Sequence, residues 1–327
     1  MTTNTRTDIL AYITTHTSAT PKQLQDALGI GGAAIHRQLL KLQETSLITK
    51  LGTSPRVFYV LVASSSDSKV VDTIPSEIAK PIEQEFFYIS PTGAISEGRE
   101  GFVKWCDERS LPVAKTAKEY MQTLKKYHAY VLPNGLIDGM PKMEATFGTV
   151  YLDEVYYLDF YAIERFGKTK LGSLLLYAKQ SQNKDLLIRL FDLVTTKMQR
   201  LIKTSRIASL TFVPPTVKRT VQLQKELEQV LHSTLPQVPV YKVSTDIPVP
   251  QKTLSRLEDR IANAKSSMII PAQSPINSPI LVIDDAIGSG ASMNEMAFKI
   301  KQINPKAKVI GLALTGSFKG FDVLQEV

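Results

Sequence analysis

The stretch from residue 279 to residue 294, PILVIDDAIGSGASMN, constrains the fold more than any other part of the chain. Its apolar residues 280–283 predict a short buried strand. Two carboxylates follow directly, at Asp284 and Asp285, and small residues then lead into an amphipathic helix from about Met293. Glycines let backbone N–H groups close on an anion, and a helix N-terminus adds a favourable dipole. This order predicts a phosphate site, with two carboxylates beside it that suit sugar hydroxyls.

The same stretch resembles the signature with which type I phosphoribosyltransferases bind phosphoribosyl pyrophosphate (PRPP). That signature has an apolar strand, two acids, two small or apolar residues and a Thr/Ser-Gly-x-Thr/Ser loop. The resemblance implies that Asp284 and Asp285 hold the ribose hydroxyls. It implies that the 5′-phosphate is held by the loop that follows, namely Ile287, Gly288, Ser289, Gly290, Ala291 and Ser292.

The sequence departs from this signature at two positions. Ala286 stands where a larger aliphatic residue is usual, and Gly288 stands where Thr or Ser is usual. One hydroxyl donor is therefore lost, while the backbone donors remain. The alternative for the loop taken alone is a glycine-rich turn of a Rossmann-like sheet.

Residues 156–327 alternate expected strands with expected helices, which indicates a doubly wound α/β fold with a parallel sheet and helices on both faces. In such a fold, ligands lie at the carboxyl ends of the strands. Strands are expected at 156–161, 207–213, 238–243, 280–283 and 309–314, and helices at 184–203 and 221–231.

Two further segments resemble the ComF-like branch of the family. Residues 212–219 resemble its pyrophosphate loop, and the resemblance implies roles there for Pro215, Thr216, Lys218 and Arg219. Residues 251–263 stand where the family keeps a flexible catalytic loop. The cations that would close over pyrophosphate are Lys252, Arg256 and Arg260. A basic solvated helix is the alternative for the second segment.

The ComF resemblance is incomplete. The Arg-Gly-Phe-Asn-Gln run expected after the pyrophosphate loop is absent, because residues 220–222 read TVQ. Its zinc ribbon is excluded by the single cysteine, Cys106. Cys106 stands beside Trp105 and is expected to be a small buried hydrophobe rather than a reactive thiol.

Residues 1–61 predict three helices, near 6–16, 20–28 and 33–44, and then a β-hairpin over 47–61. This order resembles a winged helix-turn-helix domain, whose third helix enters the major groove and whose hairpin contacts the DNA backbone or the minor groove. The side chains that would meet DNA are His36, Arg37, Gln38, Lys41, Lys50 and Arg56. A winged helix used for protein contact or dimerisation is the alternative.

Two segments join these domains. Residues 62–83 are serine-rich at their start and contain Pro75 and Pro81, so a flexible tether is expected. Residues 84–155 resemble no family; a strand is expected at 86–89 and helices at 101–109 and 114–127. Because phosphoribosyltransferases usually carry a variable hood above the base, this segment is a candidate hood, and residues 315–320 are a candidate lip of the base pocket.

Composition sets the remaining expectations. The 327 residues carry a net charge of +8, which permits a nucleic-acid or polyphosphate partner. No apolar run approaches the roughly 20 residues of a membrane span, and the N-terminal residues lack the pattern of a signal peptide. A cytoplasmic protein without membrane contact is therefore expected.

The resemblances imply a DNA-binding protein with a PRPP- or nucleotide-binding domain. One hypothesis is a ligand-sensing transcriptional regulator. The other is an active phosphoribosyltransferase or a ComF-like protein of DNA uptake and repair, and a structural role remains a third. In an enzyme, Mg²⁺ would bridge pyrophosphate oxygens without a direct protein ligand, and no general base is identified. A homodimer is expected by analogy.

Overall fold

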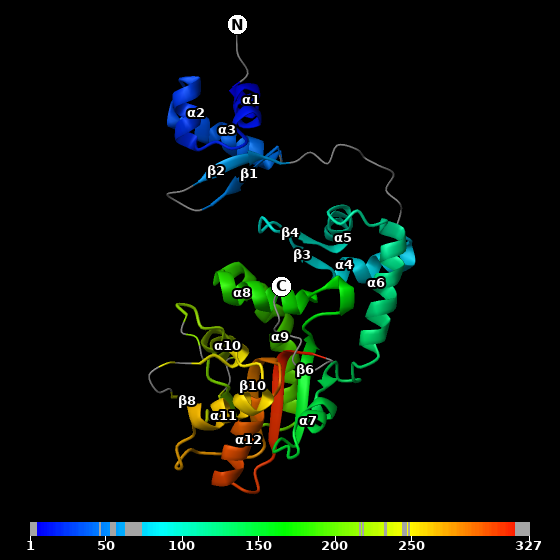
Figure 1. Ribbon diagram of the computed structural model, residues 1–327, viewed down its shortest axis with the longest axis vertical. Coiled ribbons are helices and arrows are strands. Elements are labelled where there is room, and N and C mark those ends of the chain that lie inside the picture. The colour runs from blue at the N-terminus through cyan, green and yellow to red at the C-terminus, as the bar shows by residue number, and fades with distance from the viewer. Residues whose placement is uncertain are drawn as a thin grey trace. The chain divides into compact units, whose positions relative to one another are not determined.

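The computed structural model describes residues 5–45, 47–52, 57–62, 74–215, 217, 219–231, 234–243, 247 and 249–317 (Figure 1). The chain forms two compact units, residues 1–71 and residues 72–327. No helix among the described residues is long and apolar enough to cross a membrane.

The first unit consists of three helices followed by a β-hairpin, as expected. Their bounds are α1 Thr5–His16, α2 Pro21–Leu28, α3 Gly32–Glu44, β1 Ile48–Leu51 and β2 Phe58–Leu61. A capping box starts α2, because the Thr20 hydroxyl accepts from the N–H of Gln23 and the Gln23 side chain accepts from the N–H of Thr20. Gly29 ends the helix in the left-handed conformation with φ 64°. The apolar faces of the three helices meet around Ile35.

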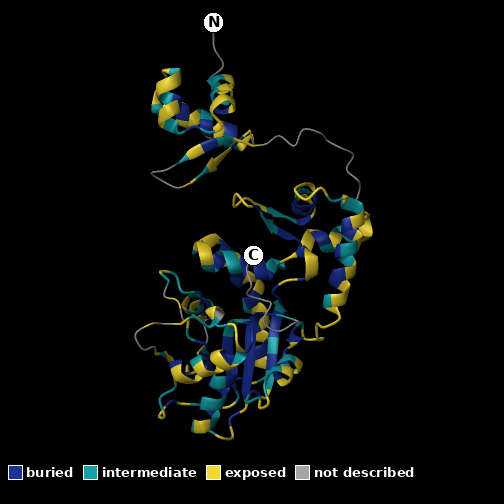
Figure 2. Ribbon diagram, in the orientation of Figure 1, coloured by how far each residue is buried: buried dark blue, intermediate teal, exposed yellow. Residues whose placement is uncertain are grey.

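A five-stranded, mostly parallel sheet forms the centre of the second unit. Its strands are β5 Ile137–Asp138, β6 Glu154–Phe160, β7 Ser209–Phe212, β10 Ile280–Ile287 and β11 Val309–Gly316. Their order across the sheet is β5-β6-β11-β10-β7, and only β5 is antiparallel. The two central strands, β10 and β11, are near-continuous apolar runs because both of their faces are covered (Figure 2).

Helices cover both faces of this sheet. Alternate residues of β10 divide between two cores, since Leu281 and Ile283 pack in one and Ile280 and Val282 in the other. The first core is closed by α8 Lys170–Ser181, α9 Lys184–Thr204 and α10 Leu223–Leu231. The second is closed by α7 Met140–Thr146, α11 Leu257–Ser267 and α12 Ala291–Ile303.

Residues 74–128 form an α+β layer that joins the second core. Its elements are α4 Ser76–Glu85, β3 Phe87–Ile89, β4 Ile95–Glu97, α5 Gly98–Asp107 and α6 Val113–His128. Edge-to-face aromatic pairs hold it together, including Phe86 on Phe102 at 5.0 Å between ring centroids. Cys106 is buried here, and burial raises the pKa of its thiol to about 11, which makes it unreactive.

The expectation of a tether over 62–83 is wrong for residues 76–83, which belong to α4. The helix contains Pro81 and follows Pro75. It forms despite these prolines because Ile78, Ile82 and Phe86, spaced four residues apart, pack into the second core. Residues 63–73 lie outside the described residues.

The strand expected over 238–243 is also wrong in part. Only Tyr241–Lys242 forms a strand, β8, and it pairs antiparallel with β9 Met268–Ile269 outside the main sheet. Pro236 and Pro239 lack the N–H donors of a strand ladder. The residues before β8 therefore join the main sheet through a parallel bridge between Gln237 and Leu210, and the Thr211 hydroxyl donates to the Val238 carbonyl at 2.8 Å.

Candidate functional site

The strand order places a topological switch point between β7 and β10. After β7 the chain passes through α10 and returns beside β7 on its outer edge, at Gln237. It then crosses to the other side of β7 to form β10, and continues away from it to β11. Ligands of open α/β sheets bind at the carboxyl ends of the strands at such a point.

A cavity of about 300 Å³ opens at this position. Its walls come from the residues after β7, including Val213 and Pro215, from Leu175 and Lys179 of α8, and from residues 284–293. The volume lies at the lower end of the range for small-molecule pockets, roughly 300–1,000 Å³.

The two aspartates lie inside β10 rather than after it, because the strand continues to Ile287. Beyond the acids, Ala286 still pairs with Thr315 and Ile287 with Gly316. Side chains of a strand alternate between its faces. The side chains of the two aspartates therefore leave opposite faces of the strand, yet both line the cavity and their carboxyls lie close enough to interact. Asp285 forms an ion pair with Lys179 of α8, and the charge of Asp284 acts on Lys242 of β8.

The electrostatics of the pair differ from one aspartate to the other. Burial raises the pKa of Asp284 well above its usual range, and the charge of Asp285 raises it further, while Lys179 opposes this shift. The backbone N–H of Asp285 donates to the Asp284 carboxyl at 2.7 Å. A buried carboxyl that is costly to charge gains from hydroxyl donors or a cation brought by a ligand.

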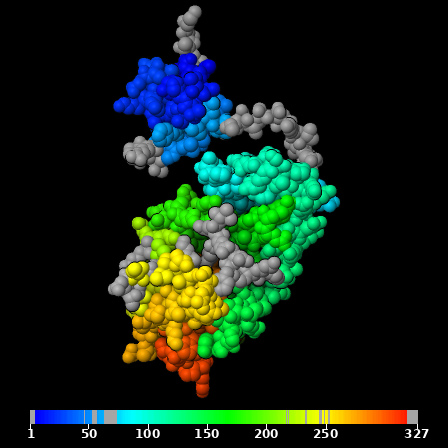
Figure 3. Space-filling view, viewed as in Figure 1, coloured from blue at the N-terminus to red at the C-terminus, as the bar shows by residue number. Residues whose placement is uncertain are grey.

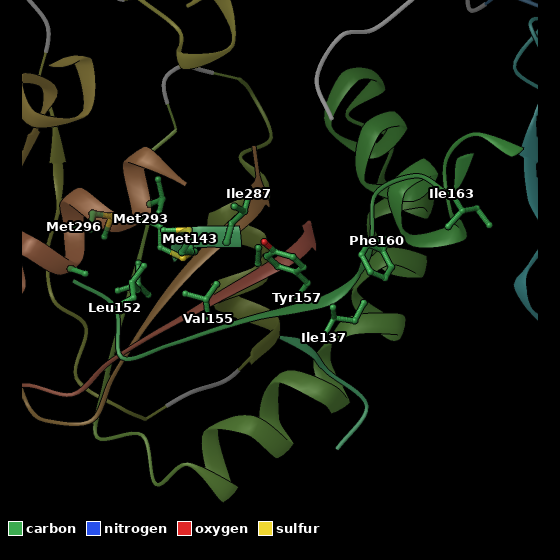
Figure 4. Close-up of a cluster of buried hydrophobic side chains, with 14 of the residues drawn as sticks. Ile137, Met143, Leu152, Val155, Tyr157, Phe160, Ile163, Ile287, Met293 and Met296 are labelled. Atoms are coloured by element: carbon green, nitrogen blue, oxygen red, sulfur yellow. The ribbon is translucent and has the colours of Figure 1, made fainter. Parts of the chain in front are cut away.

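The small-residue loop after the acids is backed by α7. Gly290 adopts φ 85° and precedes α12 directly. A Cβ at this position would lie 2.5 Å from the sulfur of Met143, so only glycine fits. Met143 packs between Ile287 and Met293 (Figure 4), and residues 288–293 line the cavity on the other side.

Polar contacts also fix this loop. The Lys142 ammonium donates to the Ser317 hydroxyl at 2.8 Å and reaches the Ile287 carbonyl at 3.5 Å. Burial lowers the pKa of Lys142 to about 8. Asn294 in the first turn of α12 accepts from the N–H of Tyr151 and donates to the Thr149 carbonyl. The start of α12 is thus held on two sides, with its N-terminal amides at the cavity.

Some of the residues predicted for the pyrophosphate loop and the flexible loop line the cavity, and others do not. Pro215 and Arg219 line the cavity, as does Arg260, whose side chain is 6% exposed and donates to the Leu254 carbonyl at 2.7 Å. Arg256 does not line it, because it is exposed and pairs with Glu258 at 3.6 Å. Its segment, between η2 Gln251–Thr253 and α11, lies at the surface of the second unit (Figure 3). Thr216, Lys218 and the side chain of Lys252 lie outside the described residues.

The sequence interpretation missed two lysines of this cavity. Lys179 comes from α8 and Lys242 from β8, far apart from the acids in the chain. No local pattern marks either one, since only the packing of α8 and of β8 brings them to the aspartates.

The structure does not place the expected hood at this cavity. None of the described residues that line it comes from 84–155. Within that segment, Met143 and Phe147 instead face the back of the loop at Gly290. Of the segment expected as the lip, residues 315–320, Thr315 and Gly316 belong to β11 and are buried. Residues 318–320 lie outside the described residues.

In the first unit, α3 presents most of the predicted DNA-facing side chains. His36, Arg37 and Lys41 are exposed on this helix, and Lys50 is exposed on β1. Gln38 is half-buried and accepts from the Arg6 guanidinium at 3.0 Å, so it anchors α1 to α3. Arg56 lies outside the described residues.

Comparison of the sequence with models of protein families and with curated proteins finds no match to either.

Proposed function

We propose that the second unit binds a phosphorylated pentose of the PRPP or nucleotide class, and that the first unit binds double-stranded DNA. The protein is then a DNA-binding regulator that responds to this ligand. One observation carries the proposal: β10 runs through two aspartates and a glycine loop into α12, at the switch point of the sheet, beside a cavity of about 300 Å³.

The chemistry of the cavity matches the parts of such a ligand. The backbone amides of residues 288–292 lie at the N-terminus of α12, where the helix dipole also favours an anion, so they suit a terminal phosphate. Asp284 and Asp285 offer acceptors for ribose hydroxyls. This assignment is the one that the resemblance to type I phosphoribosyltransferases implies for these residues.

The first unit supports the DNA-binding part of the proposal. Three helices and a hairpin in this order are the architecture of a winged helix, and exposed cations on α3 and β1 suit phosphates and base edges. Lys41 and Arg37 lie one helical turn apart, so both reach one groove from a single helix face.

A second candidate function is phosphoribosyl transfer itself. It is favoured by three cations that line the cavity besides Lys179, namely Arg219, Lys242 and Arg260, which suit a second anionic group such as pyrophosphate. In the reaction, a nitrogen nucleophile would form a bond to ribose C1 while the bond to pyrophosphate breaks. Among the described residues no three His, Cys, Asp or Glu side chains cluster as metal ligands, so a Mg²⁺ ion would be held mainly by the ligand's own oxygens.

Calorimetric titration of the full chain with PRPP and Mg²⁺ tests the ligand proposal. The double variant Asp284→Asn, Asp285→Asn should lose measurable PRPP binding. A matched variant with the same charge change on exposed helix positions, Asp192→Asn with Glu228→Gln, should keep it. Equal PRPP affinity in both variants would reject the assignment.

Two further measurements separate regulator from enzyme. DNA from upstream of the protein's own gene is titrated with and without PRPP, and pyrophosphate release is followed against a panel of purines and pyrimidines. A change of DNA affinity on adding PRPP, without turnover, supports the regulator. Pyrophosphate release with any base supports the enzyme. DNA binding by the Asp284→Asn, Asp285→Asn variant should match wild type when PRPP is absent.

A further inference from the structure

A second, smaller cavity lies at the carboxyl end of β6, against helix α6. Its volume is about 30 Å³, enough for one or two waters or a small head group, since one water needs roughly 10–15 Å³. Its polar lining is Glu85, Tyr120, His128, Asp159 and Thr169, and its aromatic lining includes Tyr127 and Phe160. Phe160 and Ile163, which both line it, lie at the far end of β6 from Met143 (Figure 4).

Two carboxylates face this cavity, and neither forms an ion pair with a residue that the structure describes. Asp159 accepts from the backbone N–H of Phe160 at 2.7 Å, and the adjacent Thr169 hydroxyl donates to the Phe160 carbonyl at 2.7 Å. The nearby lysines are engaged elsewhere: Lys197 donates to the Leu158 carbonyl at 3.3 Å, and Lys126 pairs with Glu164. The charge of Lys197 acts on Asp159 without forming an ion pair with it, and Glu85 is exposed. Two carboxylates without an ion-pair partner at one hollow favour a cation.

The hydroxyl of Tyr120 supplies an independent indication of a ligand. Tyr120 is 3% exposed and lines the cavity, and its hydroxyl has no hydrogen-bond partner among the described residues. Tyr120, Glu85 and Asp159 line the same cavity; burial raises the pKa of Tyr120, and the charges of the two carboxylates raise it further. The polar groups of largely buried side chains are normally paired. A ligand with several N–H donors would satisfy all three groups.

The surroundings define the rest of the ligand. The Tyr127 and Phe160 rings pack edge to face at 4.9 Å between centroids, and aromatic rings attract cations. At the mouth, Val131 lines the cavity, and it is exposed together with its neighbours Tyr130 and Leu132. An apolar chain attached to a buried cationic head would lie over these side chains.

We propose that this cavity binds the primary ammonium group of a small alkylamine, held by Asp159, Glu85 and Tyr120, with its alkyl chain leaving over residues 130–132. The site shares no residue with the cavity between β7 and β10. The inference therefore goes beyond the proposed pentose phosphate site and does not depend on it.

Titration of the full-length protein with butylamine hydrochloride at pH 8 tests the proposal. Butan-1-ol controls for binding of the alkyl chain without the ammonium group, and sodium chloride controls for the effect of added salt. Burial raises the pKa of Asp159 to about 6, so it is ionised at pH 8. Saturable binding is expected for butylamine only. Equal binding of butan-1-ol, or a cavity that holds water only and binds no amine, would overturn the proposal.

Two variants locate the binding. Asp159→Asn should weaken butylamine binding about 10-fold or more, as expected for a charged hydrogen bond, and Tyr120→Phe about 3- to 10-fold. Because the Tyr120 hydroxyl has no hydrogen-bond partner among the residues that the structure describes, Tyr120→Phe should leave the unfolding midpoint of the free protein unchanged. This keeps the test interpretable if Asp159→Asn folds poorly. Asp107→Asn, an exposed carboxylate that does not line the cavity, is the control. Unchanged affinity in Tyr120→Phe and in any folded Asp159→Asn would refute the site.

Discussion

Replacing Gly290 with alanine perturbs the loop on which the proposed phosphate site depends. The residue adopts φ 85°, a conformation that costs an L-residue roughly 1–2 kcal/mol. Its new Cβ would also lie 2.5 Å from the Met143 sulfur and 2.9 Å from the Met143 methyl carbon. Overpacking of this kind typically costs about 1–3 kcal/mol. The expected loss of unfolding free energy for Gly290→Ala is therefore about 2–5 kcal/mol.

The structure offers a matched control and a rescue for this variant. Gly135 has φ 80° with no atom within 4 Å of a built Cβ, so Gly135→Ala should cost only the conformational part, about 1–2 kcal/mol. In a Met143→Ala background the clash disappears, and the further cost of Gly290→Ala should fall to the same value. The difference between backgrounds measures the contact directly.

Urea unfolding followed by tryptophan fluorescence is the assay. The single tryptophan, Trp105, lies buried in the second unit, so its signal reports this unit alone. PRPP affinity should fall about tenfold or more in Gly290→Ala, because the amides at the start of α12 must shift. An unchanged unfolding midpoint, or the same cost with and without Met143, would refute this description of the loop.

Three further predictions concern the charged groups. Lys179→Met should weaken PRPP binding about tenfold, seen by calorimetry, because Asp285 loses its cation and the two aspartates repel each other more; an unchanged affinity would contradict the role of the ion pair. Arg37→Ala and Lys41→Ala should each weaken DNA binding and lower the slope of log K against log salt by about 0.9 if each contacts one phosphate, whereas a slope equal to wild type would show that α3 does not face DNA. The pKa of Asp159 is raised in the folded protein to about 6, so as pH falls the native state takes up this proton at a higher pH than the unfolded state does. The free energy of unfolding should therefore rise by the contribution of this group as pH falls from about 7 toward 4. Urea midpoints across this range should show that gain in wild type and not in Asp159→Asn.

Local signals explain which parts of the fold were predictable. Thr20 and Gly29 mark the two ends of α2, and the helix expected at 184–203 is α9 almost unchanged. The strand, acids, glycines and helix of residues 280–303 also follow one another in the structure as expected. Each of these depends on residues that are close in the sequence.

The features that were missed depend on packing between distant segments. Pro81 suggested a break, yet Ile82 and Phe86 bury α4 against aromatic residues that come later in the chain. β10 extends past Asp285 because β11 continues beside it to Gly316. Lys179 reaches Asp285 only through the docking of α8 on the sheet. Such partners carry no periodic or motif signal of their own.

A crystal structure of the protein with PRPP and Mg²⁺ tests the central proposal most directly. The proposal predicts a phosphate within hydrogen-bond distance of the amides of residues 288–292, with ribose hydroxyls on Asp284 and Asp285. A sugar phosphate that binds away from the carboxyl end of β10, or a cavity that stays empty at saturating PRPP, would contradict it.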